Sequence, residues 1–213
     1  MPRITEEKRQ ARRLQILDAA TRCFAREGFY RTSMEDIVKE SGLSPGAIYC
    51  YFRSKYEIVE AISAQRHASD SDLLRDFTSA PNIREGLNRL SRALVLLLQN
   101  PKEKERRKVS IQFWAESLLD KGIRRIAKRG IRQRDRLTSA LRDAQQRGEL
   151  PDSLDADATS RVMLALLQGL ILQQAWEPQM DIEAFATTAT VLIGTALSPT
   201  KPTTSPRNRK HAS

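Results

Sequence analysis

The stretch from 32 to 55, TSMEDIVKESGLSPGAIYCYFRSK, limits the fold of this chain most strongly, because it carries a close series of helix start and stop signals. Thr32 and Glu35 have the spacing of a capping box, in which each side chain satisfies a backbone donor of the first helical turn. This pair predicts a helix that begins at about Met34. Gly42 then supplies a residue that takes the left-handed conformation at a helix end without strain.

A second short helix is predicted directly after Gly42. Ser44 is a favourable N-cap, and Pro45 suits the first helical position, where a backbone N–H would have no helical partner. A further capping-box pair, Ser54 and Glu57, starts a third helix. Two capped helices joined by a glycine turn are typical of a helix-turn-helix, although helical hairpins that never touch DNA contain the same turn.

The side chains of the second helix suit DNA binding, and a structural helical hairpin with ordinary tyrosines is the alternative. Its first turn, Pro45-Gly46-Ala47, is small enough to let the backbone approach a surface closely. Hydroxyl and positively charged groups follow at Tyr49, Tyr51, Arg53 and Lys55. This order of residues suits a recognition helix that lies in the major groove of DNA.

The run from 16 to 62, ILDAATRCFAREGFYRTSMEDIVKESGLSPGAIYCYFRSKYEIVEAI, strongly resembles the N-terminal DNA-binding domain of TetR-family transcriptional regulators. The matching pieces are ILDAA, the F-A-x-x-G-F end of the first helix, T-S-M-x-D-I and G-L-S-x-G-x-I-Y-x-Y-F-x-S-K. The resemblance implies that the rest of the chain is a divergent helical domain for ligand binding and dimerisation.

Apolar periodicity and turn signals predict an all-α fold of about nine helices. We expect a three-helix, homeodomain-like helix-turn-helix domain over 1–54, a helical effector-binding and dimerisation domain over 55–197, and a disordered basic tail over 198–213. The individual helices expected outside the helix-turn-helix are 7–27, 55–77, 82–98, 121–146, 156–176 and 182–197. The polar segment HASDSD inside 55–77 is the place for a kink or a solvated turn.

The resemblance also assigns the DNA contacts. It implies that Pro45, Gly46 and Ala47 face base edges, that Thr32, Ser33 and Ser44 flank them, and that Tyr49, Tyr51 and Lys55 grip phosphates. The three residues at the base edges cannot make bidentate side-chain hydrogen bonds, so readout would depend on apolar contact and DNA shape. Cys50 departs from the family, which often has an aromatic residue there and uses it for a backbone contact.

The last two predicted helices, 156–176 and 182–197, resemble the pair with which TetR-family members form a four-helix dimer interface. The first is apolar nearly all round, so it must be covered on both sides. A homodimer would bind a near-palindromic operator in double-stranded DNA. A purely intramolecular bundle is the alternative for the same two helices.

We expect a repressor that a small apolar or aromatic effector releases from DNA. The candidate residues for the effector pocket are Phe113, Trp114, Met163 and Trp176. Ordinary core packing is the alternative use of the aromatic cluster around Trp114. The strongly basic run 102–136 has two interpretations as well, since it can meet an anionic effector or flanking DNA, or simply face water.

Composition bounds the remaining function classes. The net charge of +10 favours a polyanionic partner, and it also allows a non-specific architectural DNA-binding protein. Neither a glycine-rich phosphate loop nor metal-ligand spacing is present, and His67 has no second ligand nearby, so we expect no enzyme, cofactor or metal site. The two cysteines lie far apart, the longest apolar stretch is too short to span a membrane, and the charged N-terminus excludes a signal peptide, which together indicate the cytoplasm.

Overall fold

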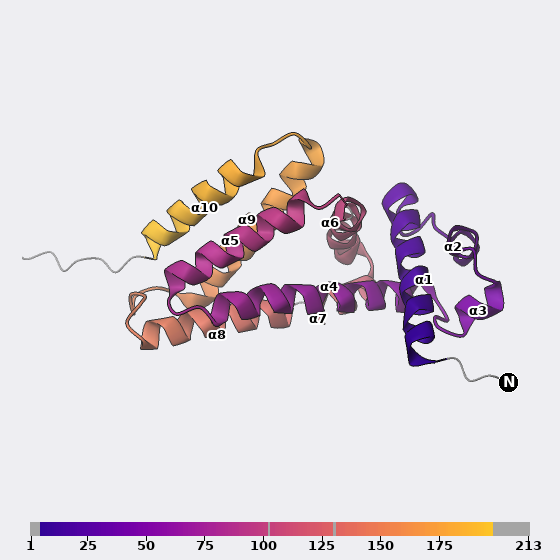
Figure 1. Ribbon diagram of the computed structural model, residues 1–213, viewed down its shortest axis with the longest axis horizontal. Coiled ribbons are helices and arrows are strands. Elements are labelled where there is room, and N and C mark those ends of the chain that lie inside the picture. The colour runs from indigo at the N-terminus through magenta and orange to yellow at the C-terminus, as the bar shows by residue number, and fades with distance from the viewer. Residues whose placement is uncertain (1–4, 102, 130, 198–213) are drawn as a thin grey trace, which may run out of the picture.

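The computed structural model of the chain describes residues 5–101, 103–129 and 131–197, except for the side chains of 67–71, 73, 129 and 131–133 (Figure 1). These residues form helices and no strands, which confirms the all-α prediction. The ten α-helices are α1 (Glu6–Glu27), α2 (Met34–Ser41), α3 (Pro45–Tyr49), α4 (Lys55–Thr78), α5 (Ile83–Gln99), α6 (Glu103–Leu119), α7 (Lys121–Arg129), α8 (Ile131–Gln146), α9 (Ala156–Trp176) and α10 (Ile182–Ala196).

The helices form a small head and a larger body that share the long helix α4. In Figure 1, α1, α2 and α3 lie at one end, and α4 runs from them along the length of the molecule. At the other end α10 packs on α5 and α9 packs on α8. Between the ends, α6 packs on α1 and α7, so the body touches the head at a second place besides α4.

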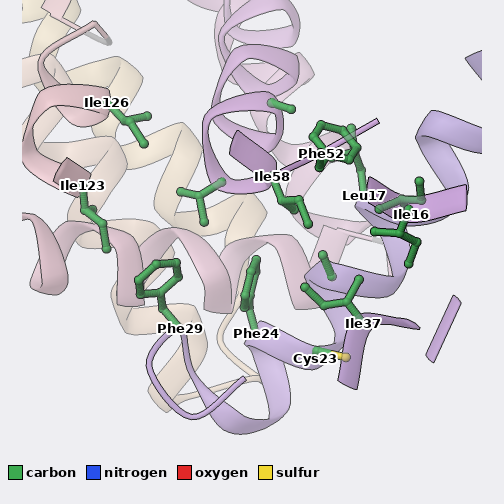
Figure 2. Close-up of a cluster of buried hydrophobic side chains, with 14 of the residues drawn as sticks. Ile16, Leu17, Cys23, Phe24, Phe29, Ile37, Phe52, Ile58, Ile123 and Ile126 are labelled. Carbon is green, nitrogen blue, oxygen red and sulfur yellow. The ribbon is translucent and has the colours of Figure 1, made fainter. Parts of the chain in front are cut away.

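A continuous apolar core holds the head together, and it is not closed by residues 1–54 alone. Figure 2 shows Phe24 of α1 and Ile37 of α2 packed in one cluster with Ile58 of α4 and with Ile123 and Ile126 of α7. Full burial of such a side chain stabilises a fold by about 1.5 to 3 kcal/mol. The expected boundary at residue 54 therefore marks a change of helix, while the packing continues across it.

Two expected helix caps differ from the structure by one position. Ser33, rather than Thr32, is the N-cap of α2: its hydroxyl accepts from the Asp36 N–H at 3.1 Å, and the Asp36 carboxylate accepts from the Ser33 N–H at 2.8 Å. At α4, Ser54 accepts from the Glu57 N–H as expected, but the Glu57 carboxylate accepts from Arg53 N–H at 2.7 Å. The helix starts themselves were predicted correctly.

Two of the predicted helices, 121–146 and 55–77, can be compared with the structure in detail. The predicted helix 121–146 is covered by α7 and α8, and residue 130 between them lies outside the described parts. Helix α4 continues through HASDSD, where a kink or solvated turn was expected.

Some expectations fall on residues that the structure does not describe. The side chain of His67 and the tail 198–213 both lie outside the described parts. Within the described residues, none of the helices is both long enough and apolar enough to cross a membrane.

Candidate nucleic-acid interface and effector cavity

Helix α3 is short, and local signals fix its position. The Ser44 hydroxyl caps it by accepting from the Ala47 N–H at 3.3 Å, and Gly42 ends α2 just before it with φ of 67°. Ile48 points inward and is fully buried in the core of the head. The opposite side of the first turn, with Pro45 and Gly46, is exposed. The structure therefore presents a small, uncharged helix start to the outside.

The other residues expected to contact DNA differ in how exposed their side chains are. Ser33 is exposed, and the Tyr49 side chain is 50% exposed beyond the recognition turn. Tyr51 is partly buried and packs against the core of the head. Thr32 is only 1% exposed, and its hydroxyl donates to the Gly28 carbonyl at 2.8 Å. The enclosed Thr32 side chain thus shapes the turn before α2, and a direct contact of this side chain with DNA stays an untested prediction.

Lys55, for which a phosphate contact is predicted, points inward in this structure. Its ammonium group donates to the carbonyl oxygens of Phe29 at 2.8 Å, Thr32 at 2.5 Å and Tyr30 at 3.4 Å. It also lies 4.7 Å from the centre of the Phe29 ring. Burial lowers the pKa of this ammonium group. With three carbonyl partners for its three protons, Lys55 holds the loop before α2 in place.

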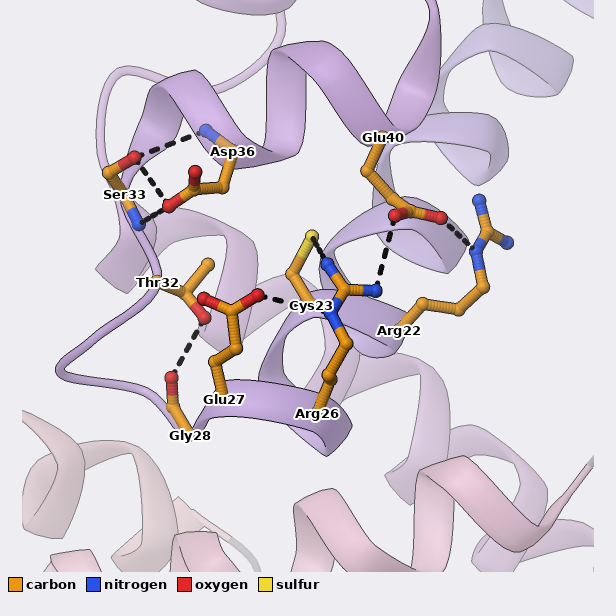
Figure 3. A network of polar contacts seen from close by, with 9 residues as sticks. All are labelled: Arg22, Cys23, Arg26, Glu27, Gly28, Thr32, Ser33, Asp36 and Glu40. Carbon is orange, nitrogen blue, oxygen red and sulfur yellow. Dashed lines mark hydrogen bonds and ion pairs between the residues drawn. The ribbon is translucent and has the colours of Figure 1, made fainter.

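Ion pairs fix α2 against α1. In Figure 3 the Glu40 carboxylate accepts from Arg22 at 2.7 Å and from Arg26 at 3.3 Å. The Arg22 hydrogen bond, helped by Arg26, holds the pKa of Glu40 below its usual range. Cys23 lies beneath this network, and burial raises the pKa of its thiol, whereas Cys50 is exposed. The network orients the helix-turn-helix without using any group on its outer face.

This arrangement predicts acid sensitivity of the head. A carboxylate whose pKa is lower in the folded state stabilises the fold above its unfolded pKa of about 4.3, and that contribution is lost as the pH falls through the folded value. Glu40→Gln is expected to be less stable than wild type at pH 7 and to lose less stability between pH 5 and 3. Thermal melting across this range measures both. Glu35→Gln, at an exposed position of the same helix, is the control and should retain the wild-type profile; parallel profiles for all three proteins would contradict the assignment.

Other cations remain on the outer surface of the head. Arg53 is exposed between α3 and α4, Arg31 is exposed before α2, and Lys39 is exposed within α2. Further exposed cations, at Lys8, Arg9 and Arg12, line the start of α1. Arg53 was noted in the sequence as a basic residue but was not singled out as a contact. Arg53 is exposed, whereas Lys55, two residues later, points into the head.

The body contains an apolar cavity of about 150 Å³. Its walls come from α5, α9 and α10, with Leu74 of α4 and Leu137 of α8. Aliphatic side chains and Phe185 make up most of the lining, and the hydroxyl groups of Ser91 and Thr190 are its polar side-chain groups. The Thr190 hydroxyl donates to the Ala186 carbonyl at 2.8 Å. Such a lining accepts an uncharged, largely apolar molecule, since a charged one would lose its hydration without gaining an ion partner.

Of the four expected pocket residues, the structure places only Met163 in this cavity wall. Phe113 packs against the core of the head, and Trp114 packs in a cluster of the body with Leu98 and with Leu170, which also lines the cavity. Trp176 is 71% exposed at the end of α9. Phe113 and Trp114 fill space between helices and Trp176 lies on the surface, so none of the three lines this cavity, and their part in effector binding stays a prediction.

An exposed apolar surface covers the outer sides of α9 and α10. Val162, Leu166 and Trp176 of α9 are exposed at helical spacing. On α10, Val191 and Leu192 are 61% and 65% exposed and do not line the cavity, whereas Leu166 of α9 also belongs to the cavity wall. We call these five side chains the terminal-helix face. Exposed apolar groups that gather on one part of a surface are typical of interaction surfaces.

Comparison with known proteins decides the family. A model described as "Bacterial regulatory proteins, tetR family" matches residues 16–62, which contain α2 and α3. A second model, described as "BetI-type transcriptional repressor, C-terminal", matches residues 87–197, over half of the chain. The chain belongs to the TetR family of transcriptional regulators.

Individual relatives agree with this assignment. The chain is 32% identical to the regulator TtgR of Pseudomonas putida, over 80% of this chain and 83% of TtgR. Among solved structures it is similar to GusR of Salmonella enterica, with a TM-score of 0.76, 25% identity and coverage of 92% and 99%. It is also similar to SmeT of Stenotrophomonas maltophilia in complex with triclosan, with a TM-score of 0.77, 25% identity and coverage of 89% and 93%.

As a TetR-family regulator, the chain binds DNA through the head that carries α2 and α3. The family assignment favours a regulator over the non-specific architectural protein that net charge alone allowed. The family consists of transcriptional regulators rather than enzymes. Among the described residues, no group of three His, Cys, Asp or Glu side chains is placed to hold a metal ion.

Proposed function

We propose that this TetR-family protein is a homodimeric, cytoplasmic repressor, without enzymatic activity, that a small uncharged apolar molecule releases from a near-palindromic operator. The apolar cavity in the body carries this proposal, because it offers a ligand site in a part of the fold that is separate from the DNA-binding head. The similar protein SmeT supports it, since SmeT is the repressor of a multidrug efflux pump and forms a complex with triclosan.

On the DNA side, α3 would enter the major groove with its exposed first turn, Pro45 and Gly46, against the base edges. These residues have no side-chain donors, so the operator would be recognised by apolar contact and by DNA shape. Tyr49 and Arg53, both exposed, would contact phosphates. Lys55 would contribute indirectly by holding the loop before α2.

A second copy of the chain would cover the terminal-helix face. Helices α9 and α10 each present one apolar side to their neighbours in the body and a second apolar side to the outside. Four such helices, two from each copy, would enclose these side chains in a common core. The resulting twofold symmetry would place two recognition helices on related half-sites of the operator.

Release would follow if the effector prefers a body conformation in which the recognition helices are misplaced. Helix α4 is suited to transmit this change, because Leu74 near its far end lines the cavity and Ile58 near its start belongs to the core of the head. A coupling free energy of about 1 to 3 kcal/mol between the two sites is typical of allosteric proteins. It corresponds to about 5- to 150-fold weaker DNA binding in the presence of effector.

The effector site is tested with molecules of different charge and with a variant in which a side chain fills the cavity. An aliphatic cavity of about this volume holds a guest the size of benzene, so toluene is the first probe, with benzoate and benzylammonium as charged molecules of similar size. We expect toluene to raise the melting temperature and to weaken binding to the operator probe. The operator probe is the duplex that the wild-type protein binds most tightly in a selection from DNA upstream of its own gene and from random duplexes. The charged molecules are expected to do neither.

A variant with a filled cavity provides the control. Ala186→Phe, which puts a ring into the cavity wall, should bind the operator probe normally and show no response to toluene. Ala115→Phe makes the same change at an exposed position of α6 and should respond like wild type. Equal responses of wild type and Ala186→Phe to toluene would place the effector site elsewhere.

A further inference from the structure

Two tyrosines of the head share one carboxylate of the body. The hydroxyl of Tyr56, in the first turn of α4, donates to Asp120 Oδ2 at 2.7 Å. The hydroxyl of Tyr30, in the loop before α2, donates to the same oxygen at 3.3 Å. Asp120 lies between α6 and α7. We call Tyr30, Tyr56 and Asp120 the clasp; it joins segments that are far apart in sequence.

The corner that carries Asp120 is held firmly by its own hydrogen bonds. Asp120 Oδ1 accepts from the Ile123 N–H at 2.8 Å and so caps the start of α7. Arg124 donates to the carbonyl oxygens of Ser117 and Leu118 at the end of α6. Ile123 is buried in the core of the head. Asp120 is therefore a fixed anchor rather than a mobile surface group.

The loop that the clasp holds leads directly into α2. Lys55 binds its carbonyl groups from inside, and Asp120 binds its Tyr30 side chain from outside. The Phe29 ring lies between, at 5.3 Å from the rings of both Tyr30 and Tyr56 in edge-to-face geometry. A Cβ added at Gly122 would lie 2.9 Å from the Tyr56 ring, so this ring packs directly against the turn of the body.

We propose that Asp120 is a positioning residue for DNA recognition: through Tyr30 and Tyr56 it fixes the helix-turn-helix in its operator-binding orientation relative to the body. The inference rests on the proposed sequence-specific DNA binding. Asp120 cannot itself attract a phosphate, because both carry negative charge. Any contribution that it makes to operator affinity must therefore pass through the residues that it holds.

The positioning role of Asp120 is tested by comparing binding to the operator probe with binding to a scrambled duplex, because we expect different effects on the two affinities. Asp120→Ala is expected to weaken binding to the operator probe about tenfold, because two hydrogen bonds to a charged group are lost. The same variant should bind a scrambled duplex at low salt as well as wild type or more tightly, since a negative charge has been removed. Asp155→Ala removes a comparable N-cap, that of α9, and should leave both affinities at the wild-type level.

A second variant avoids the loss of the α7 cap. Tyr30→Phe combined with Tyr56→Phe keeps both rings and removes only the hydroxyl groups, and it should also weaken operator binding about tenfold. Adding Asp120→Ala to this variant should cause little further loss, because residues that act through one contact are not additive. Without DNA, amide exchange of residues 28–33 should be faster in these variants than in wild type.

Three results would overturn the proposal. One is unchanged operator affinity and unchanged amide exchange in the double tyrosine variant. Another is an equal gain of affinity for both duplexes in Asp120→Ala, which would show a purely electrostatic role. The third is an equal loss for both duplexes with a lower melting temperature, which would show only a contribution to stability. A wild-type protein that prefers no duplex would overturn the proposed regulatory function itself, together with the assignment of Asp120 to it.

Discussion

Replacing both Val191 and Leu192 with glutamate is expected to convert the protein into a monomer and to weaken operator binding by about 10²- to 10⁴-fold. Both side chains are exposed on α10 and belong to the terminal-helix face. A dimer through this face would bury the new carboxylates without partners, at a cost of several kcal/mol. The monomer would lose the linkage between two half-site contacts, and that linkage accounts for the size of the effect.

Sedimentation gives the oligomeric state of this variant, and titration with the operator probe gives its affinity. The matched control is glutamate at both Leu118 and Leu119, an adjacent pair of exposed apolar residues at the end of α6. This control carries the same added charge and should remain dimeric. A dimeric Val191→Glu, Leu192→Glu protein with wild-type affinity would show that the two copies associate through a different surface.

Lys55→Met is expected to lower the free energy of unfolding by about 2 kcal/mol, because hydrogen bonds from a charged group to enclosed carbonyl oxygens are lost. Operator affinity should fall with it, since the loop before α2 would no longer be fixed. The dependence of binding on salt concentration should keep its wild-type slope, because no phosphate contact is removed. Denaturant unfolding and a salt series measure the two effects separately.

Arg53→Met is the matched comparison for Lys55→Met, because it removes one charge from a neighbouring but exposed position. It should leave the unfolding free energy unchanged and reduce the slope of log affinity against log salt by about one. The opposite outcome, with a smaller slope and normal stability for Lys55→Met, would return Lys55 to the role of phosphate contact.

Local signals in the sequence were sufficient for the helix-turn-helix. Gly42 takes a positive φ of 67°, and Ser44 and Pro45 start α3, as their residue types predicted. Asn82 and Asp155 likewise cap the helices that they were expected to begin or precede. These features depend on hydrogen bonds and backbone angles within a few residues, so the sequence contains all the information that they need.

The sequence alone could not decide which polar side chains face outward. Thr32 with Glu35 and Ser33 with Asp36 have the same capping-box spacing, and only the burial of Thr32 beside Gly28 separates them. Lys55 is basic and follows the recognition helix, which suggests phosphate binding. Its carbonyl partners, however, lie far back in the chain, and only the fold brings them to its ammonium group.

For function, too, features within one short segment could be predicted from the sequence, whereas features that depend on distant segments could not. The motifs of the head determined the family, because they report contacts made within one short segment. The apolar cavity that we propose as the effector site is the space left between α5, α9 and α10, and it is lined mainly by aliphatic residues that no motif marks. Aromatic residues were the natural guess for its walls, but Phe113 and Trp114 fill space elsewhere. The volume that remains empty depends on how all the helices pack together, so only the tertiary structure could locate it.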